Sequence, residues 1–134
     1  MTVPFACVAV AFLLIYAIRI PVIVAQLRAG GGYDNRNPRD QQAKLDGWAR
    51  RAVAAHANAF EGFAPFAAAV VIAHLGHADP GWSTALAVIY VVARAIYPVL
   101  YIANISLARS IVWLIGFSAT TSLFLLPFLT ASPG

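Results

Sequence analysis

Charged and amide side chains recur at helical spacing within an apolar segment that covers residues 48–75. Arg51, Asn58 and Pro65 follow one another at intervals of seven residues, and Glu61 comes three residues after Asn58. An α-helix turns by about 100° per residue, so this spacing places all four residues on one face. That face presents a guanidinium, an amide and a carboxylate to whatever packs against it.

A second polar stripe is present in the next apolar segment. Arg94, Tyr97, Tyr101 and Asn104 are separated by three or four residues, which again places them on one helix face. We expect Arg94 to pair with Glu61 across the two helices, because pairing reduces the cost of burying either charge. Ionisable residues within a membrane helix usually face the protein interior and mark function.

Neither stripe contains a self-sufficient catalytic centre. The chain has no Ser/His/Asp arrangement with suitable spacing, no carboxylate dyad and a single cysteine, Cys7. A nucleophile would therefore come from a bound cosubstrate. The arginines and tyrosines, with Arg28 and Arg109 at the ends of the first and fourth apolar segments, suit a small anion such as a carboxylate-bearing thiol. A guanidinium close to the sulfur would stabilise its thiolate.

Structural roles compete with ligand binding for several of these residues. The arginines near the helix ends, Arg28, Arg50 and Arg51, would also suit contacts with anionic lipid head groups. The two tyrosines of the second stripe would suit an aromatic belt at the membrane interface. Asn58 and Glu61 would equally suit structural hydrogen bonds between helices.

Two histidines and an aspartate lie near the end of the second apolar segment. His74 and His77 have a spacing similar to that of metal ligands on a helix, and Asp79 is close to them. The two histidines have the spacing of a metal-binding pair only, and no further ligand is evident on the neighbouring predicted helices. We therefore favour a solvated turn and expect no metal site.

The composition indicates a membrane protein. Of the 134 residues, 61% are hydrophobic and 10% are charged, whereas soluble domains contain about 25% charged residues. A membrane crossing takes about 20 mostly apolar residues, so the length accommodates four crossings and no separate soluble domain. We predict an all-α integral membrane protein with a single domain, residues 1–134. It would form a four-transmembrane-helix bundle with helices at about residues 3–26, 48–75, 82–105 and 110–129.

Basic residues are concentrated at one end of this predicted bundle. The loop of residues 27–46 and its flanks contain most of them, namely Arg28, Arg36, Arg39, Lys44, Arg50 and Arg51. The loop at the other end, residues 76–81, and both termini contain neither lysine nor arginine. The positive-inside rule therefore predicts a cytoplasmic 27–46 loop and two external termini.

The first polar stripe resembles the signature of a known family of membrane proteins. The segment from Arg51 to Phe66, with Asn58, Glu61 and Pro65 in it, is similar to the second-helix signature of the MAPEG family. These are the membrane-associated proteins in eicosanoid and glutathione metabolism, which include microsomal glutathione transferases and leukotriene and prostaglandin synthases.

The second stripe strengthens this resemblance. The run Arg94-Ala-Ile-Tyr97 followed by Tyr101 matches the family's Arg-x-x-Tyr-x-x-x-Tyr pattern. Arg109 also fits, and its Arg-Ser-x-x-Trp context is similar to the bacterial-type branch of the family. The motifs occur in the family's order over about residues 28–113.

The resemblance implies a four-helix subunit of a homotrimer, in a bacterial inner membrane. Glutathione, as cosubstrate, would bind between neighbouring subunits near the cytoplasmic side, and lipophilic substrates would arrive from the bilayer. Arg109 would stabilise the glutathione thiolate, and Tyr101 would donate a hydrogen bond to it. The residues that would bind glutathione are Arg28, Arg51, Asn58, Glu61, Arg94 and Tyr97.

Two functions are consistent with these features. We predict a membrane glutathione-dependent transferase or peroxidase that acts on hydrophobic electrophiles. The alternative is a non-catalytic trimeric membrane protein, a lipid-binding or scaffold element that retains the family fold. Ala54 favours this alternative, because the glutathione-using members of the family carry an arginine at that position. A transporter is disfavoured, since the chain has neither an inverted repeat nor a broken helix pair.

Overall fold

Four long helices and one short helix make up the part of the protein that the structure describes. The computed structural model describes residues 1–130, and every regular element in that range is an α-helix. The helices are α1 (Val3–Arg28), α2 (Pro38–Ala43), α3 (Gly47–Leu75), α4 (Pro80–Ile102) and α5 (Ser106–Thr130). In the described range, α1, α3, α4 and α5 are each long and apolar enough to cross a membrane. The predicted all-α integral membrane fold is confirmed.

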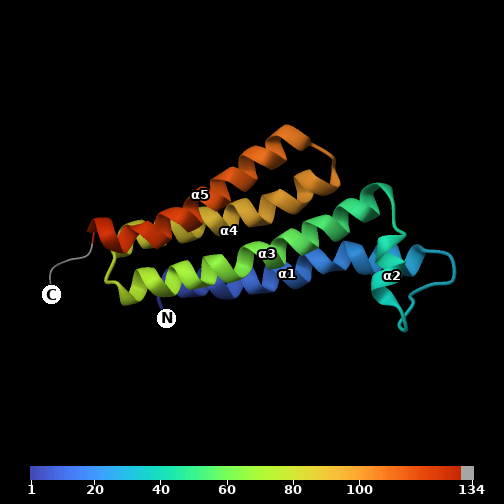
Figure 1. The fold of residues 1–134 in the computed structure, drawn as a ribbon, viewed down its shortest axis with the longest axis horizontal. Helices are drawn as coiled ribbons and strands as arrows, with labels where there is room; N and C mark the ends of the chain where they lie inside the picture. The colour runs from blue at the N-terminus through green and yellow to red at the C-terminus, as the bar shows by residue number, and fades with distance from the viewer. Residues whose placement is uncertain (131–134) are drawn as a thin grey trace.

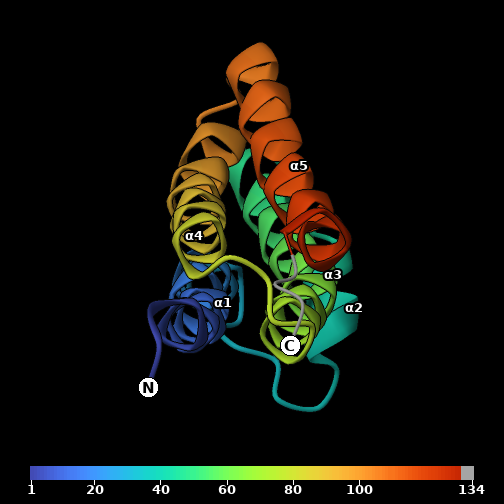
Figure 2. The ribbon, with the colours of Figure 1, turned by 90° about the vertical axis from the view of Figure 1, so that its left-hand side faces the viewer.

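The long helices run lengthwise and alternate in direction (Figure 1). Helix α1 packs against α3 and α4, and α5 packs against α3 and α4. Within residues 1–130, α1 and α5 share no contact, and they occupy diagonal positions when the bundle is viewed end-on (Figure 2). Helices α4 and α5 diverge from α1 and α3 toward the end that carries the α4–α5 connection (Figure 1). We call this end, with connections 29–46 and 103–105, the basic end.

Small side chains allow the helices to approach closely. The buried residues of α3 are mostly alanines, and His56, Phe66 and Val70 are the larger side chains among them. Phe66 and Leu123 are both 0% exposed and belong to one cluster that joins α1, α3, α4 and α5. Small residues at helix contacts are typical of membrane bundles, where close packing rather than water exclusion drives association. Large apolar side chains such as Leu107 and Phe128 point outward, as expected for surfaces in contact with lipid.

The α4–α5 connection is shorter and lies earlier than predicted. Helix α4 ends at Ile102, and α5 already begins at Ser106. Asn104 adopts a left-handed conformation with φ 63°, and the amide of Ile105 donates to the Leu100 carbonyl at 3.0 Å. This is a Schellman termination, which asparagine can support in place of glycine. As a result, Asn104 leaves the polar stripe, and Arg109 lies inside α5 instead of in the connection.

The basic loop contains a short helix that the sequence pattern did not predict. Helix α2 is tied to α1 by glutamines: Gln26 Nε2 donates to Gln41 Oε1 at 3.1 Å, and Gln42 Nε2 donates to Gln26 Oε1 at 3.3 Å. Gln26 is 0% exposed. Amide groups can donate and accept at once, so three glutamines suffice to hold the loop against the bundle.

Candidate functional site

Asn58 connects the two charges that were expected to pair directly. Arg94 Nη2 donates to Asn58 Oδ1 at 2.9 Å, and Asn58 Nδ2 donates to Glu61 Oε2 at 3.4 Å. Within residues 1–130 no direct hydrogen bond joins Glu61 to Arg94, so the predicted pair is wrong in this form. The reason is that an amide presents an acceptor toward α4 and a donor toward Glu61. Arg94 is only 7% exposed, whereas Glu61 is exposed.

Tyr90 sets the position of Arg94 beside α3. Its hydroxyl donates to the Gly62 carbonyl at 2.8 Å, and its ring stacks on Phe66 with centroids 3.7 Å apart. A Cβ atom at Gly62 would lie 3.0 Å from the Tyr90 hydroxyl and 3.6 Å from Arg94 Cζ. Because Gly62 has no side chain, α4 can approach α3 this closely. Sequence reasoning missed Tyr90, although its place four residues before Arg94 puts it on the same face.

A cleft of about 270 Å³ opens beside these residues, between α3, α4 and α5. We call it the deep cleft. Its α3 and α4 walls carry the polar groups, and its α5 wall carries aromatic and hydroxyl side chains. The lining residues are Asn58, Glu61, Gly62, Pro65, Tyr90, Arg94, Trp113, Gly116, Phe117, Thr120, Thr121 and Phe124.

A second cleft, of about 250 Å³, lies nearer the basic end and is lined by Tyr97, Tyr101, Arg109, Ser110 and Trp113. We call it the basic-end cleft. The Arg109 guanidinium lies over the Tyr101 ring, with Cζ 4.4 Å from the centroid. Tyr101 meets Tyr97 edge to face at 5.7 Å. These contacts hold the guanidinium at the rim of the cleft by cation–π attraction.

The two clefts adjoin at one shared residue and at one contact between their linings. Trp113 lines both of them, and Arg94 Cζ lies 4.9 Å from the centroid of the Tyr97 ring. Sequence reasoning missed Trp113, whose place four residues after Arg109 was the available signal. A continuous series of contacts thus runs from the interior to the basic end through Glu61, Asn58, Arg94, Tyr97, Tyr101 and Arg109.

Two of the predicted binding residues lie outside both clefts. Arg51 Nε donates to the Ile102 carbonyl at 3.0 Å, which places its positive charge at the C-terminus of α4, where the helix dipole favours a cation. Arg28 is exposed at the end of α1, the helix that does not touch α5 in the described chain. Neither arginine lines a cleft.

The clefts together offer a defined set of chemical groups. Arg94 and Arg109 supply positive charge, Tyr97 and Tyr101 supply hydroxyl groups, and Asn58 supplies an amide. Such a set can bind an extended, anionic molecule with peptide-like groups and hold a thiolate close to a guanidinium. The aromatic wall on α5 can receive an apolar molecule.

Comparison with known proteins agrees with the motifs. The model of the MAPEG family matches residues 3–129, which include the four long helices except the last residue of α5, and every residue that lines the two clefts. No curated protein and no solved structure matches the chain.

Proposed function

Because this chain belongs to the MAPEG family, we propose that it is a glutathione-dependent transferase or peroxidase that acts on hydrophobic electrophiles in the membrane. The observation that carries this proposal is the unbroken series of hydrogen-bond, cation–π and ring contacts from Asn58 through Arg94 and the two tyrosines to Arg109. It connects the deep cleft to the basic-end cleft.

The length of this series suits a tripeptide. Helix α4 rises by about 1.5 Å per residue, so Arg94 and Tyr101 are about 10 Å apart along its axis. A fully extended tripeptide spans about 10 Å. One carboxylate of glutathione would bind the guanidinium of Arg94, and the carboxylate at the other end of the tripeptide would bind basic groups at the basic end. Asn58 and Glu61 would bind its amide and amino groups. The thiol would then lie near Tyr101 and Arg109.

The chemistry proposed for this end is activation of the thiol. The S–H proton leaves to water, and the Arg109 guanidinium stabilises the thiolate by its charge. Tyr101 donates a hydrogen bond to the thiolate or to the electrophile. In the transferase reaction the sulfur forms a bond to an electrophilic carbon, while the displaced or opened group takes up a proton.

The electrophile would enter by way of the deep cleft. Trp113, Phe117 and Phe124 form the α5 side of that cleft, and Trp113 and Phe117 stack with their ring planes 7° apart. Apolar molecules concentrate in the bilayer, and this aromatic wall would receive them from there. Trp113 also lines the basic-end cleft, so the electrophile would meet the thiolate at this residue.

A homotrimer would complete the site. Arg28 does not reach the clefts of its own chain, because α1 lies diagonally opposite α5 (Figure 2). It can contribute to a cleft only when it comes from a neighbouring subunit. In the proposed orientation the basic end faces the cytoplasm of a bacterial inner membrane, where water-soluble glutathione has access to it.

The test is a titration of the detergent-purified protein with glutathione, followed by the ultraviolet absorbance of the thiolate. We expect Arg109→Ala to abolish the thiolate signal while the oligomeric state is retained. Arg36→Ala, a charge loss in the exposed part of the basic loop, should leave the signal unchanged. Absence of glutathione binding at physiological millimolar concentration would contradict the proposal.

The non-catalytic alternative has one observation in its favour. Asn58 already hydrogen-bonds to both Arg94 and Glu61 within the chain, and Ala54 lines neither cleft. In that case the polar series is structural, and replacing both Glu61 and Arg94 with apolar residues would leave folding and any measurable ligand binding intact. The catalytic proposal expects the same double variant to lose glutathione binding.

A further inference from the structure

A third pocket lies away from both clefts, between α2 and α3. Its volume is about 360 Å³, and it is lined by Arg39, Gln42, Val53, His56, Ala57 and Phe60. None of these residues lines the deep cleft or the basic-end cleft. The volume lies within the range of small-molecule sites, which is about 300–1,000 Å³. We call it the α2–α3 pocket.

His56 is the buried polar group of this pocket. It is 6% exposed, and its Nε2 atom is fully enclosed without a hydrogen-bond partner among residues 1–130. The ring is held edge to face by Phe60, with centroids 5.2 Å apart. Buried polar nitrogens in native proteins nearly always have a partner, because leaving one unpaired costs free energy. We therefore expect the Nε2 atom of His56 to have a polar partner that is not among the described residues.

The charge around the pocket is positive. Arg39 Nη1 donates to Gln42 Oε1 at 3.3 Å, and the glutamine is itself held by Gln26, so the arginine is fixed at the rim. Arg39 lines the pocket together with His56, and Arg19, a half-buried residue of α1, adds a second positive charge in the neighbourhood of the His56 ring. None of the residues that line the pocket is acidic. A basic pocket at the membrane surface favours an anion.

The remaining wall is apolar and runs toward the membrane interior. Val53, Ala57 and Phe60 are separated by four and three residues, so they form one stripe on α3. Phe60 is 51% exposed. The pocket thus combines a cationic, hydrogen-bonding rim with an apolar strip, which matches an anionic head group attached to an acyl chain.

We propose that the α2–α3 pocket binds the anionic head group of a bilayer lipid. Arg39 donates hydrogen bonds to phosphate oxygens, and the His56 ring turns on binding so that its Nε2–H donates to the same group. The first part of an acyl chain lies along Val53, Ala57 and Phe60. The lipid anchors α2 to α3 at the basic end. This site is independent of the proposed glutathione chemistry, because it shares no residue with either cleft.

Binding is tested on the delipidated full-length protein in detergent. Short-chain phosphatidylglycerol, short-chain phosphatidylcholine and inorganic phosphate are titrated separately, and the Tm and the mass of the native complex are recorded. We expect phosphatidylglycerol to bind and raise the Tm, and phosphatidylcholine and phosphate to do so at least about tenfold more weakly. Equal affinity for the two lipids would overturn the proposal, as would equal affinity for free phosphate.

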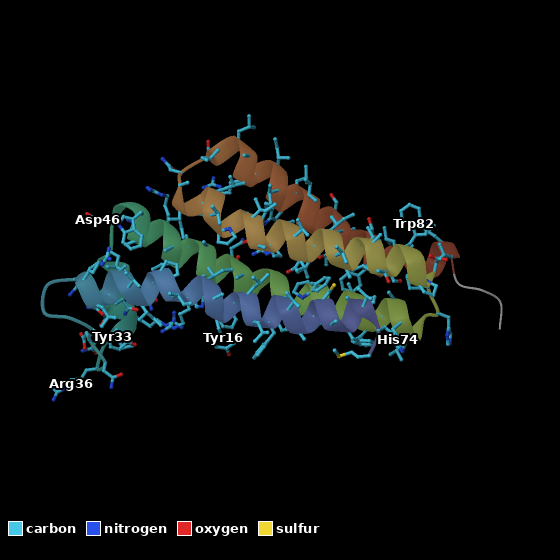
Figure 3. All side chains as sticks on the ribbon, turned by 180° about the vertical axis from the view of Figure 1, so that it is seen from behind. Tyr16, Tyr33, Arg36, Asp46, His74 and Trp82 are labelled. Atoms are coloured by element: carbon cyan, nitrogen blue, oxygen red, sulfur yellow. The ribbon has the colours of Figure 1, made fainter. Side chains whose placement is uncertain are left out.

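Variants locate the site. Arg39→Gln and His56→Leu should each weaken phosphatidylglycerol binding about tenfold, and His56→Gln should recover most of it, because its amide also donates. The matched control is Arg36→Gln, which removes the same charge from a side chain that points away from the helices (Figure 3). An equal loss in the control would overturn the proposal, because it would show a diffuse charge effect.

Two further measurements separate this site from the others. Circular dichroism confirms that each variant is helical, and the His56→Gln variant keeps the test valid if His56→Leu does not fold. Saturating glutathione should not displace phosphatidylglycerol, and Arg109→Ala should leave lipid binding unchanged. Displacement by glutathione would assign the pocket to the thiol site and refute the lipid proposal.

Discussion

At the scale of single residues, Asn58 has the largest structural role in the candidate site. It accepts from the buried Arg94 guanidinium at 2.9 Å and donates to Glu61 at 3.4 Å. A guanidinium inside a membrane helix is costly unless its donors are satisfied. The amide satisfies one donor without adding a charge, and it leaves the exposed Glu61 carboxylate available to the cleft. Stability and ligand binding therefore depend on the same side chain.

This arrangement predicts a cost for removing the amide. Asn58→Leu has a similar size but leaves Arg94 buried without its acceptor, so the free energy of unfolding should fall by about 2–3 kcal/mol. Reversible unfolding in mixed micelles measures the change. Asn35→Leu, at an exposed position in the basic loop, is the control and should change stability little. An Asn58→Leu protein as stable as the parent would show that Arg94 finds another acceptor.

At the scale of elements, the helix ends decide where the site residues lie. Helices α3 and α4 both end in a Schellman arrangement whose left-handed residue is not glycine, His77 with φ 53° and Asn104 with φ 63°. The amide of Ala78 donates to the Ala73 carbonyl at 3.0 Å, just as Ile105 does to Leu100. The early end of α4 lets α5 begin at Ser106, which brings Arg109 over Tyr101. The position of Arg109 thus depends on a turn, and not on the stripe itself.

The opposite end of the bundle contains a close contact that can be tested. Gly76 follows α3, and a Cβ atom there would lie 2.6 Å from Cβ of Pro127 in α5. Both sides are rigid, so Gly76→Ala should separate α3 from α5 and lower the free energy of unfolding by about 1–3 kcal/mol. The control is Gly30→Ala, where an added Cβ meets nothing within 4 Å. Comparable stability of the two variants would mean that α5 shifts without cost.

At the scale of the whole molecule, polarity is distributed in two ways. Along the bundle axis, most of the basic residues lie at the end with the 29–46 and 103–105 connections, and Arg19 and Arg94 lie farther inside α1 and α4. Around the axis, the two clefts lie on the α3–α4–α5 side, whereas the α2–α3 pocket involves other faces of α3. A single chain therefore carries its proposed thiol site and its proposed lipid site on different surfaces. This separation leaves room for a neighbouring subunit at the clefts.

The charge distribution along the axis predicts the orientation in the membrane. In a Cys7→Ser background, Arg36→Cys should react with a membrane-impermeant maleimide only from the cytoplasmic side, because basic loops remain there. His77→Cys, at the opposite end, should react only from outside. Labelling of right-side-out and inverted vesicles measures both. Labelling of the Arg36→Cys protein from outside would reverse the proposed topology.

The sequence by itself determined the four spans and the two polar stripes. Hydropathy and length are sufficient for the spans, because the bilayer imposes both. The stripes follow from the helical period, so Asn58 and Glu61 share a face, as do Arg94, Tyr97 and Tyr101. The family motifs could be recognised from the sequence for the same reason, because each motif consists of residues within a single helix.

Only the tertiary structure decided how these faces meet. The rotation and spacing of neighbouring helices result from the packing of residues that are far apart in the sequence, such as Tyr90 against Gly62. That packing places Asn58 between Glu61 and Arg94, makes Trp113 a wall of both clefts, and keeps Arg28 and Arg51 away from them. It also buries His56 in a pocket completed by α2, a helix whose glutamine contacts have no periodic signal. The helical period determines in which direction a side chain points from its own helix. Which residue of another helix it meets depends on the contacts between the helices.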